Sequence, residues 1–333
     1  MRQLVFHGPG RLSVEEAEAR ALGPGELRLA VHSVGVCGSD VHGYAGVNAR
    51  RVPGMVMGHE TIGIVEELGP ETDGPPVGTA VTVNPLTACG ACEQCRAGAE
   101  NICPNRRIYG CVLDLPGAYA DSFVVRSGNA VPFEGPAPLE WGALTEPFSV
   151  GAHAVGLGAV EPGSDAMVVG GGPIGVGAAL AAREAGALRV VVSEPNGHRR
   201  AVAEQLGLET FDPTTGELPQ EFAIAFECVG HSATLAAALN AVPPRGRVMF
   251  VGLAEETIDL PTTPLMVGER SISGSAAYTM SEFRTTSDWI ASAAVDLSPV
   301  IENRVDLDGL PGVFDGYAGG SLDAMKTLLQ PTD

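Results

Sequence analysis

The chain has 333 residues, of which 45% are hydrophobic, and because this length exceeds the usual size of one hydrophobic core it predicts two domains. Its 40 acidic and 20 basic residues give a formal net charge of -20 at pH 7, and such a surface repels nucleic-acid phosphates and anionic lipid headgroups. Nucleic-acid and membrane partners are therefore disfavoured.

The N-terminal segment reaches Gly8 and Pro9 before an apolar run of signal-peptide length has formed. The apolar, uncharged run over residues 166–182 is interrupted by glycines and falls short of the roughly 20 apolar residues that cross a bilayer. Seven cysteines without an export signal argue against a disulfide framework. We expect a protein of the reducing cytoplasm.

The first 150 residues contain short β-rich runs separated by glycine and proline, without a long helical period. The predicted strands cover residues 25–34, 61–68, 79–83 and 118–125. From residue 164 the pattern changes to apolar β runs that alternate with alanine-rich helical stretches. The predicted strands there are 166–169, 189–193, 222–227, 247–251 and 271–275, and the predicted helices are 174–185, 198–206 and 232–242.

Apolar strands separated by helices are typical of a parallel sheet covered on both faces, so the second half predicts a doubly wound α/β domain. The last stretch, which ends in a predicted helix over 321–329, is too short to form a domain and is expected to pack onto the first half.

Three separated motifs in the first half contain residue types that bind metals. They are Cys37-Gly38-Ser39-Asp40-Val41-His42, Gly58-His59-Glu60 and Glu146-Pro147. A thiolate, an imidazole and a carboxylate make three protein ligands and leave a fourth position for water or an alcohol, as a catalytic zinc requires. Taken singly each is weak evidence, because a lone cysteine is more often a small buried residue and a lone histidine a satisfied core or loop residue.

A second group of four cysteines lies within fifteen residues with the spacing C-x2-C-x2-C-x7-C. Its members are Cys89, Cys92, Cys95 and Cys103. Four soft ligands close a tetrahedral zinc shell without a vacancy, so this site predicts a structural zinc that holds a lobe over residues 86–105. An iron-sulfur cluster and a redox dithiol are the alternatives, and the dithiol leaves two thiols unexplained.

A glycine-rich turn lies between predicted strand 166–169 and predicted helix 174–185. It reads Gly170-Gly171-Gly172-Pro173-Ile174-Gly175 and matches G-x-G-x-x-G. Gly170 can make a tight turn, Gly172 lets the backbone approach a pyrophosphate, and Gly175 lets the helix pack closely, with positive charge at the helix N-terminus. The alternative is an ordinary strand-to-helix turn of another α/β fold.

An acidic residue follows at the position where dinucleotide sites bind a ribose. Glu194 lies nineteen residues beyond Gly175, at the end of the next predicted strand. A carboxylate there accepts hydrogen bonds from the ribose hydroxyls and repels a 2′-phosphate, so NAD is favoured. NADP remains an alternative because Arg199 and Arg200 follow closely.

In combination, these motifs resemble the zinc-containing medium-chain dehydrogenase/reductase family along nearly the whole chain. The segment 142–151, which includes Glu146-Pro147, resembles the polyol, sorbitol, butanediol and threonine dehydrogenase branch, in which glutamate replaces a ligand cysteine of other alcohol dehydrogenases. The resemblance implies a GroES-like, mainly β catalytic domain over 1–148, a Rossmann NAD-binding domain over 149–277, and a C-terminal return to the catalytic domain over 278–333.

The resemblance also implies roles for individual residues. Cys37 and His59 would be permanent ligands of a catalytic zinc, with Glu60 as a direct or switching ligand. Glu146 would be a ligand or would act through the metal-bound water. Asp40 would orient His59 by accepting from its free ring nitrogen. With the structural site, two zinc ions per chain are expected.

The implied reaction is oxidation of a hydroxyl, in which zinc lowers the hydroxyl pKa and a hydride leaves for the nicotinamide. Ser39 would take the proton and pass it through the cofactor ribose to His42, whose ordinary pKa near 6.5 suits a relay at neutral pH. Without the flanking ligands, ordinary loop hydrogen bonding would be the better interpretation of both residues.

One departure concerns the substrate. Sorbitol dehydrogenases carry an Arg-Tyr pair after the last Rossmann strand, whereas this chain reads Ala277-Tyr278, so secondary alcohols, diols, other polyols, cyclitols and modified sugars all stay open. Two alternative enzymes stay open: a threonine-type 3-hydroxy amino acid dehydrogenase, and a zinc-independent quinone or enoyl reductase of the same fold. The third alternative is a non-catalytic binding protein. A homo-oligomer, tetramer or dimer, follows from the resemblance alone.

Overall fold

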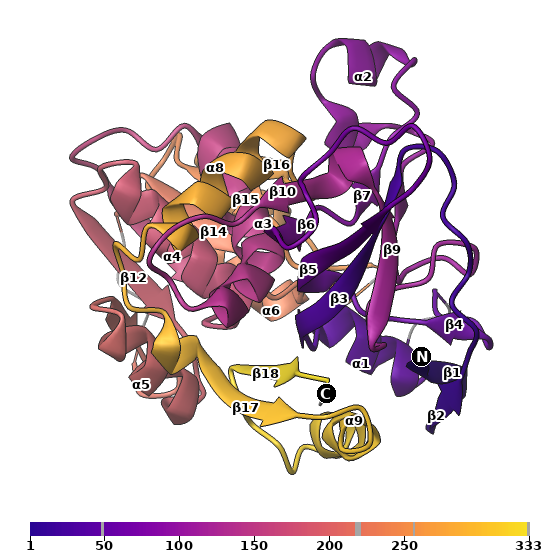
Figure 1. Cartoon of the computed structure of the whole chain (residues 1–333). Coiled ribbons are helices and arrows are strands. Elements are labelled where there is room, and N and C mark those ends of the chain that lie inside the picture. Colours follow the sequence, from indigo (N-terminus) through magenta and orange to yellow (C-terminus); the bar gives the residue numbers. More distant parts are fainter. Residues whose placement is uncertain (48–49, 217–220, 256, 332–333) are drawn as a thin grey trace. The chain divides into compact units, whose positions relative to one another are not determined.

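The computed structural model describes residues 1–47, 50–216, 221–255 and 257–331 (Figure 1). The chain divides into two compact units, which we call unit 1, comprising Met1–Glu146 and Phe283–Asp333, and unit 2, comprising Pro147–Glu282. These boundaries lie a few residues from the predicted ones at 148/149 and 277/278. Helices α3 (Thr145–Gly158) and α8 (Met280–Ala291) each run across a boundary, so the chain passes between the units within helices.

Unit 1 is built on a seven-stranded sheet with the order β10-β6-β5-β3-β18-β17, in which β9 also pairs with β3. The strands are β3 (Glu26–Gly35), β5 (Glu60–Leu68), β6 (Ala80–Val83), β9 (Ser122–Arg126), β10 (Ala130–Pro132), β17 (Ile301–Val305) and β18 (Lys326–Leu329). Along β3, buried residues such as Leu27, Leu29 and Val31 alternate with partly exposed ones, as expected for a strand with one face on a core. The strands predicted at 25–34, 61–68 and 79–83 correspond to β3, β5 and β6.

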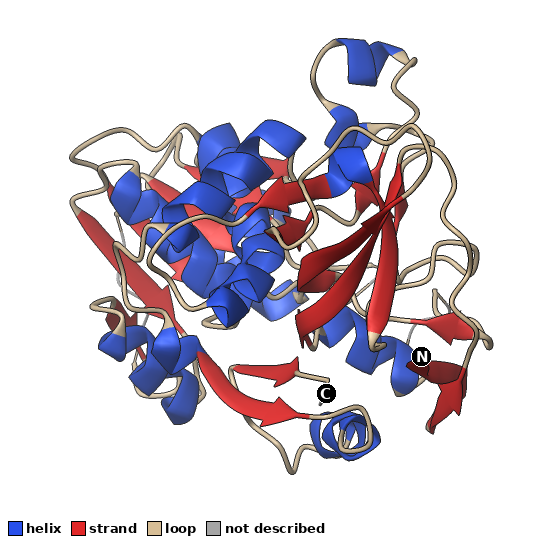
Figure 2. Cartoon of the chain, in the orientation of Figure 1, coloured by secondary structure: helices blue, strands red, loops and turns tan. Residues whose placement is uncertain are grey.

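Two smaller sheets complete unit 1. A three-stranded sheet has the order β2-β1-β4 and consists of β1 (Arg2–Gly8), β2 (Arg11–Glu16) and β4 (Met55–Val56). A two-stranded sheet pairs β7 (Leu86–Thr87) with β8 (Arg107–Ile108) and thereby closes the base of the four-cysteine lobe. The predominance of strands in this half is visible in Figure 2.

The prediction of a helix over 321–329 is wrong. Its last four residues form β18, which pairs in parallel with β17 and antiparallel with the end of β3 at Leu328↔Gly35 and Leu329↔Val34. All four of its residues are buried. A strand buried on both faces of a sheet loses the alternation of apolar and polar residues that marks a strand in sequence, and these four residues show no such alternation.

Unit 2 contains a six-stranded sheet with the order β13-β12-β11-β14-β15-β16, and every adjacent pair is parallel. The strands are β11 (Asp165–Val169), β12 (Arg189–Ser193), β13 (Glu209–Phe211), β14 (Ile224–Glu227), β15 (Arg247–Phe250) and β16 (Ser271–Gly274). The sequence predicted five of them, and β13 was missed because three residues are too few to show a period. The doubly wound fold class is confirmed.

The strand order of unit 2 reverses between β11 and β14. From β11 the chain proceeds to β12 on one side, and from β14 it proceeds to β15 on the other. Because such crossovers are right-handed, the helices after β11 and β14 cover opposite faces of the sheet. Ligands of open α/β sheets bind at the carboxyl ends of the strands at this reversal, which is where Gly170 and Cys228 begin their loops.

The helices are short. Those within unit 1 are α1 (Gly38–Tyr44), α2 (Glu93–Arg96), η1 (Glu100–Ile102), η2 (Ser127–Asn129), η3 (Leu139–Leu144), η4 (Ser298–Val300) and α9 (Leu310–Ala318); those within unit 2 are α4 (Pro173–Glu184), α5 (Gly197–Gln205), α6 (Ser232–Ala241) and α7 (Thr262–Val267). Among the described residues, none of the helices has the length and apolar character needed to pass through a bilayer.

Candidate metal and dinucleotide sites

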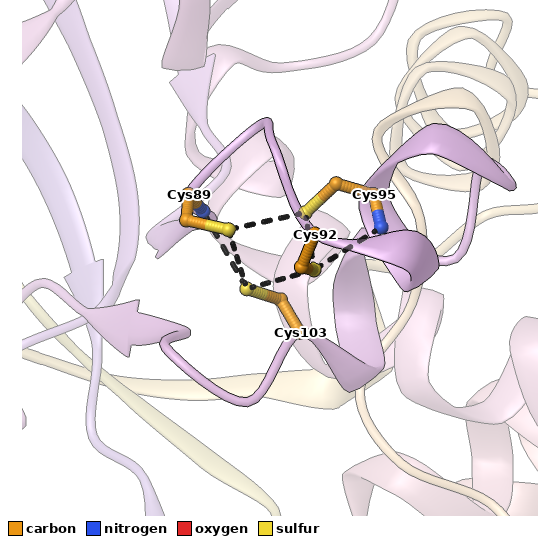
Figure 3. Close-up of side chains that lie close together, drawn as sticks. All are labelled: Cys89, Cys92, Cys95 and Cys103. Atoms are coloured by element: carbon orange, nitrogen blue, oxygen red, sulfur yellow. Dashed lines mark hydrogen bonds between the residues drawn. The ribbon is translucent and has the colours of Figure 1, made fainter.

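The four cysteines of the lobe converge on one point (Figure 3). Four of their Sγ–Sγ distances are 3.9 Å for Cys89–Cys95, 3.4 Å for Cys92–Cys95, 3.8 Å for Cys92–Cys103 and 3.5 Å for Cys89–Cys103. Zinc–sulfur bonds of about 2.3 Å in a tetrahedron require sulfurs about 3.8 Å apart, so the donor set fits one zinc ion.

The chemistry of the lobe also suits zinc. The backbone amides of Ala91 and Cys92 donate to Cys89 and lower the pKa of its thiol to about 6, which favours the thiolate that binds metal. Burial and the hydrogen bond with Cys92 raise the pKa of Cys95 to about 12, so this thiol would have to lose its proton when a metal binds. Four protein sulfurs fill a tetrahedral shell and leave no position for a substrate. The site can therefore hold the lobe together but cannot perform chemistry on an alcohol.

The second cluster arises where two strands meet. Gly35 at the end of β3 pairs with Glu60 at the start of β5. Cys37, two residues beyond β3, is the N-cap of α1, and His59 directly precedes β5. One ligand atom from each of Cys37, His59 and Glu60 lies within 4.8 Å of the others. His59 and Glu60 are buried, with 7% and 1% exposure, and Cys37 is partly exposed, so the cluster offers a thiol, an imidazole and a carboxylate together.

Asp40 lies beside His59, where the sequence placed it. Its Oδ2 is 3.5 Å from His59 Nδ1 and accepts a hydrogen bond of 3.1 Å from the hydroxyl of Tyr119. Burial alone would lower the pKa of His59, but the sulfur of Cys111 and the Asp40 carboxylate raise it well above its ordinary value. Because Nδ1 faces Asp40, Nε2 is the ring nitrogen left to bind a metal.

Arg51 is a site residue that sequence reasoning missed. Its guanidinium donates to Asp40 Oδ1 from Nε at 3.0 Å and from Nη2 at 2.7 Å, and Nη2 also donates to Ser39 Oγ at 3.2 Å. Burial would raise the pKa of Asp40, but His59 and Arg51 lower it to about 2, so the carboxylate is ionised. No local motif marks this arginine; its position eight residues before His59 is the only hint.

Lys326 is a second missed residue and the only lysine in the sequence. Its Nζ donates to Glu60 Oε2 at 2.7 Å and Oε1 at 3.0 Å and to the carbonyl of Val36 at 3.2 Å. Burial disfavours the charged amine, but the Glu60 carboxylate raises the pKa of Lys326. A Glu60 carboxylate that binds metal must therefore share this cation or move away from it.

The remaining predicted residues of unit 1 differ in their placement. Ser39 Oγ lies 3.3 Å from Cys37 Sγ, directly beside the cluster. His42 is exposed near the end of α1. Glu146, partly exposed in the first turn of α3, is not a member of the group formed by Cys37, His59 and Glu60. Cys111 belongs to neither predicted metal site, and its Sγ lies 4.0 Å from His59 Nδ1.

In unit 2 the glycine turn connects β11 to α4, as predicted. Gly170 has a φ of +101°, which favours glycine, and a Cβ on Gly175 would lie 1.9 Å from the carbonyl oxygen of Gly170. Gly172 is the N-cap of α4, followed by Pro173 and Ile174, and a Cβ there would meet no atom within 4 Å. The N-terminus of this twelve-residue helix is therefore open to a ligand where the motif needs room for a pyrophosphate.

Glu194 directly follows β12 and contacts this turn. Its Oε2 accepts from the Gly171 amide at 2.8 Å, and Oε1 accepts from the Asn196 amide at 2.9 Å. Arg200 donates to the carbonyls of Glu194 and Pro195 at 2.7 and 2.8 Å and pairs with Asp212 at 2.8 Å. Arg199 lies in the first half of α5. The edge next to the turn therefore carries the Glu194 carboxylate, and the charge of Arg200 is already paired with that of Asp212.

Two family models match the chain: the alcohol dehydrogenase GroES-like domain over residues 23–135 and the zinc-binding dehydrogenase over residues 173–292. The chain is also 33% identical to 2-dehydro-3-deoxy-L-galactonate 5-dehydrogenase from Pseudoalteromonas atlantica, over 96% of each chain. It belongs to the zinc-containing medium-chain dehydrogenase/reductase family.

Other members of this family are similar to the chain along most of its length. L-idonate 5-dehydrogenase from Vitis vinifera is 33% identical over 85% of this chain and 82% of its own. A solved zinc-binding dehydrogenase from Sinorhizobium meliloti 1021, bound to NADP, has a TM-score of 0.90 and 28% identity over 99% of each chain. The predicted GroES-like and Rossmann folds and the predicted reaction class, an NAD(P)-dependent alcohol or polyol dehydrogenase, are thereby confirmed.

Proposed function

We propose that the chain is a two-zinc dehydrogenase that oxidises a secondary hydroxyl of a polyol or sugar acid and prefers NAD. The observation that carries this proposal is the cluster of Cys37, His59 and Glu60, whose ligand atoms lie within 4.8 Å of one another. The hydroxyl of Ser39 lies beside it, 3.3 Å from the Cys37 sulfur. Mixed zinc ligands next to a proton acceptor suit the oxidation of an alcohol.

Cys37 and His59 would hold the catalytic zinc, and Glu60 or Glu146 would complete the set. Zinc bound there supplies Lewis-acid chemistry that lowers the pKa of the substrate hydroxyl. Asp40 keeps the His59 ring in orientation through Nδ1. Lys326 holds Glu60 at the start of β5 and limits when this carboxylate is free to bind.

The proton of the substrate hydroxyl would leave through α1. Ser39 Oγ would accept it and pass it toward His42, which is exposed and can release it to water. The nicotinamide, when bound, accepts the hydride. These roles account for why a serine and a histidine follow Cys37 at this spacing.

The preference for NAD rests on Glu194. Its carboxylate lies against the amide of Gly171 and would repel a 2′-phosphate, while Arg200 is already paired with Asp212. The similar dehydrogenase from Sinorhizobium meliloti was solved with NADP, so NADP is the competing cofactor. In this chain the Glu194 carboxylate favours the unphosphorylated ribose of NAD over the 2′-phosphate of NADP.

Replacing Gly172 with alanine tests the dinucleotide site. The added methyl group meets no atom within 4 Å, so the melting temperature should stay unchanged. The methyl group would keep the pyrophosphate from approaching the backbone at this turn. NADH affinity should therefore fall about 10- to 100-fold, because losing one hydrogen bond to a charged phosphate costs about 1.5–3 kcal/mol. Fluorescence titration with NADH measures this.

Gly312→Ala in α9 is the matched control, since its methyl group also meets no atom within 4 Å. It should leave NADH affinity at the wild-type value and should not lower the melting temperature, because alanine favours a helix more than glycine does. Unchanged NADH affinity in Gly172→Ala would mean that the dinucleotide does not approach this turn.

The proposed substrate class rests on the names of the relatives and on one residue that differs from the sorbitol dehydrogenases. Two relatives, each 33% identical, are named as 5-dehydrogenases of sugar acids. Sorbitol dehydrogenases are also relatives, and human sorbitol dehydrogenase is 32% identical over 99% of this chain. Because Ala277 replaces the arginine of their polyol pocket, we favour a secondary hydroxyl of a sugar acid or related polyol over sorbitol itself.

Activity assays with different cofactors and substrates, with and without zinc, separate this proposal from the alternative enzymes. We expect NAD reduction with sugar acids or polyols at a higher kcat/KM than NADP reduction, and loss of activity on chelation. Preferential activity on 3-hydroxy amino acids would favour the threonine-type alternative. Reduction of quinones or enones after complete removal of zinc would favour the zinc-independent reductase and leave the Cys37 cluster without a role.

We also propose a cytoplasmic homo-oligomer. The four lobe thiols bind zinc only when reduced, which suits the cytoplasm. The tetramer or dimer rests on the family resemblance, and light scattering coupled to size exclusion would measure it. A monomer at working concentration would contradict it.

A further inference from the structure

We propose that Arg51 is a positioning residue that holds two parts of the catalytic cluster at once: Asp40, which orients the ligand His59, and Ser39, the proton acceptor. This inference rests on the proposed function. The evidence is the guanidinium itself, whose side chain is 4% exposed and whose Nη2 donates both to Asp40 Oδ1 at 2.7 Å and to Ser39 Oγ at 3.2 Å.

The contact with Asp40 fixes a carboxylate that has little freedom to choose another partner. Asp40 is fully buried, and Arg51 holds Oδ1 through Nε and Nη2. Tyr119 holds Oδ2, the oxygen that faces His59. With both oxygens fixed, the carboxylate presents Oδ2 to the imidazole in one orientation. Without Arg51, the buried charge would turn toward other donors and the ring of His59 would lose its fixed acceptor.

The contact with Ser39 acts on the proton path. Nη2 donates to the same oxygen that would accept the substrate proton, and Ser39 Oγ also lies 3.3 Å from Cys37 Sγ. A fixed cation at this oxygen stabilises negative charge when the proton moves onward. It also keeps the hydroxyl beside the metal ligand instead of rotating into solvent, to which Ser39 is exposed.

The neighbouring helix leaves room for this arrangement. A Cβ on Gly43 of α1 would lie 2.2 Å from Cγ and 2.9 Å from Cβ of Arg51. A larger residue at position 43 would therefore displace the stem of Arg51 from its place against α1. The absence of a side chain on buried Gly43 is explained by Arg51 rather than by a turn, because Gly43 has an ordinary helical place in α1.

The experiment compares Arg51→Lys and Arg51→Met with Arg28→Met. Arg28 is the matched control: its side chain is 13% exposed, and its ion pair with Glu67 at 3.1 Å lies elsewhere in unit 1. For each protein we would measure zinc retained against increasing chelator, kcat, KM for NAD, the solvent isotope effect on kcat and the melting temperature.

In Arg51→Met we expect one zinc per chain to be lost at about 10- to 100-fold lower chelator concentration, while the lobe zinc is retained. We expect kcat to fall over a similar range, with KM for NAD unchanged and a larger solvent isotope effect, since proton transfer becomes slower. Arg51→Lys should recover only part of each value, because an ammonium keeps the charge but cannot reproduce the fork of the guanidinium. Arg28→Met should match the wild type.

Wild-type zinc retention and a wild-type isotope effect in folded Arg51→Met would overturn the inference. If Arg51→Met does not fold, Arg51→Lys and an Arg51→Ala variant assayed with millimolar guanidinium decide the question. Rescue of kcat by guanidinium supports the positioning role, and Arg51→Lys with wild-type zinc retention and isotope effect overturns it. A wild-type enzyme without zinc-dependent activity would overturn the proposed function instead, and zinc retention would still report on Arg51.

Discussion

Replacing Cys103 with serine should remove one zinc ion per chain and unfold the lobe over residues 86–105. Between residues 87 and 105 only Asn101 and Cys103 are buried, and the helix α2 has four residues, so the lobe has no apolar core of its own. Structural zinc contributes about 10–16 kcal/mol to the folding of small zinc peptides at pH 7. We expect elemental analysis to give one zinc in place of two, and trypsin to cleave rapidly after exposed Arg96.

Cys228→Ala is the control for this loss, since Cys228 belongs to unit 2 and the lobe to unit 1. Burial raises the pKa of the Cys228 thiol, which disfavours the thiolate that binds metal. It should keep both zinc ions and the wild-type resistance to trypsin. A Cys103→Ser protein with full zinc content and wild-type resistance would show that the lobe does not depend on a four-sulfur zinc site.

Lys326→Met should lower the free energy of unfolding of unit 1 by about 3–5 kcal/mol, because it leaves the Glu60 carboxylate buried without a counter-charge. The side chains of the pair are 3% and 1% exposed, so solvent cannot replace the lost cation. Both tryptophans of the chain, Trp141 and Trp289, belong to unit 1, so urea unfolding followed by tryptophan fluorescence reports on this unit.

A double replacement separates the lost pairing from lost packing. Lys326→Met combined with Glu60→Leu removes both charges and should recover most of the stability, since apolar substitutes for a buried ion pair are often neutral. If Lys326→Met alone unfolds at the wild-type urea concentration, Glu60 is not held as an anion by Lys326, and the argument that this lysine limits metal binding by Glu60 fails.

Much of both sites could be predicted because the decisive residues are local in sequence. The turn from Gly170 to Gly175 lies between a strand and a helix that the pattern of apolar residues predicts. The four cysteines of the lobe lie within fifteen residues. Cys37 and His59 each stand within a short motif. Such motifs can be recognised in a sequence because the geometry of a turn, a helix cap or a local metal site fixes the spacing of its residues.

The rest depends on long-range packing that leaves no local pattern. Lys326 reaches Glu60 across 266 positions of the chain, through a strand that pairs with β3 and was mistaken for a helix. Arg51 contacts Asp40 across 11 positions, from a loop without a motif. Such residues contact a neighbouring side chain rather than the substrate, so no motif accompanies them. The only hints in the sequence are that Lys326 is its single lysine and that Arg51 lies eight residues before His59.

Counting zinc while measuring NAD reduction during stepwise chelation would show whether Cys37, His59 and Glu60 form a catalytic zinc site separate from the four-cysteine site. We expect about two zinc ions per chain at the start, and activity that disappears with the first zinc removed and returns when zinc is restored. One zinc per chain, or activity that survives after the first zinc has gone, would contradict this expectation.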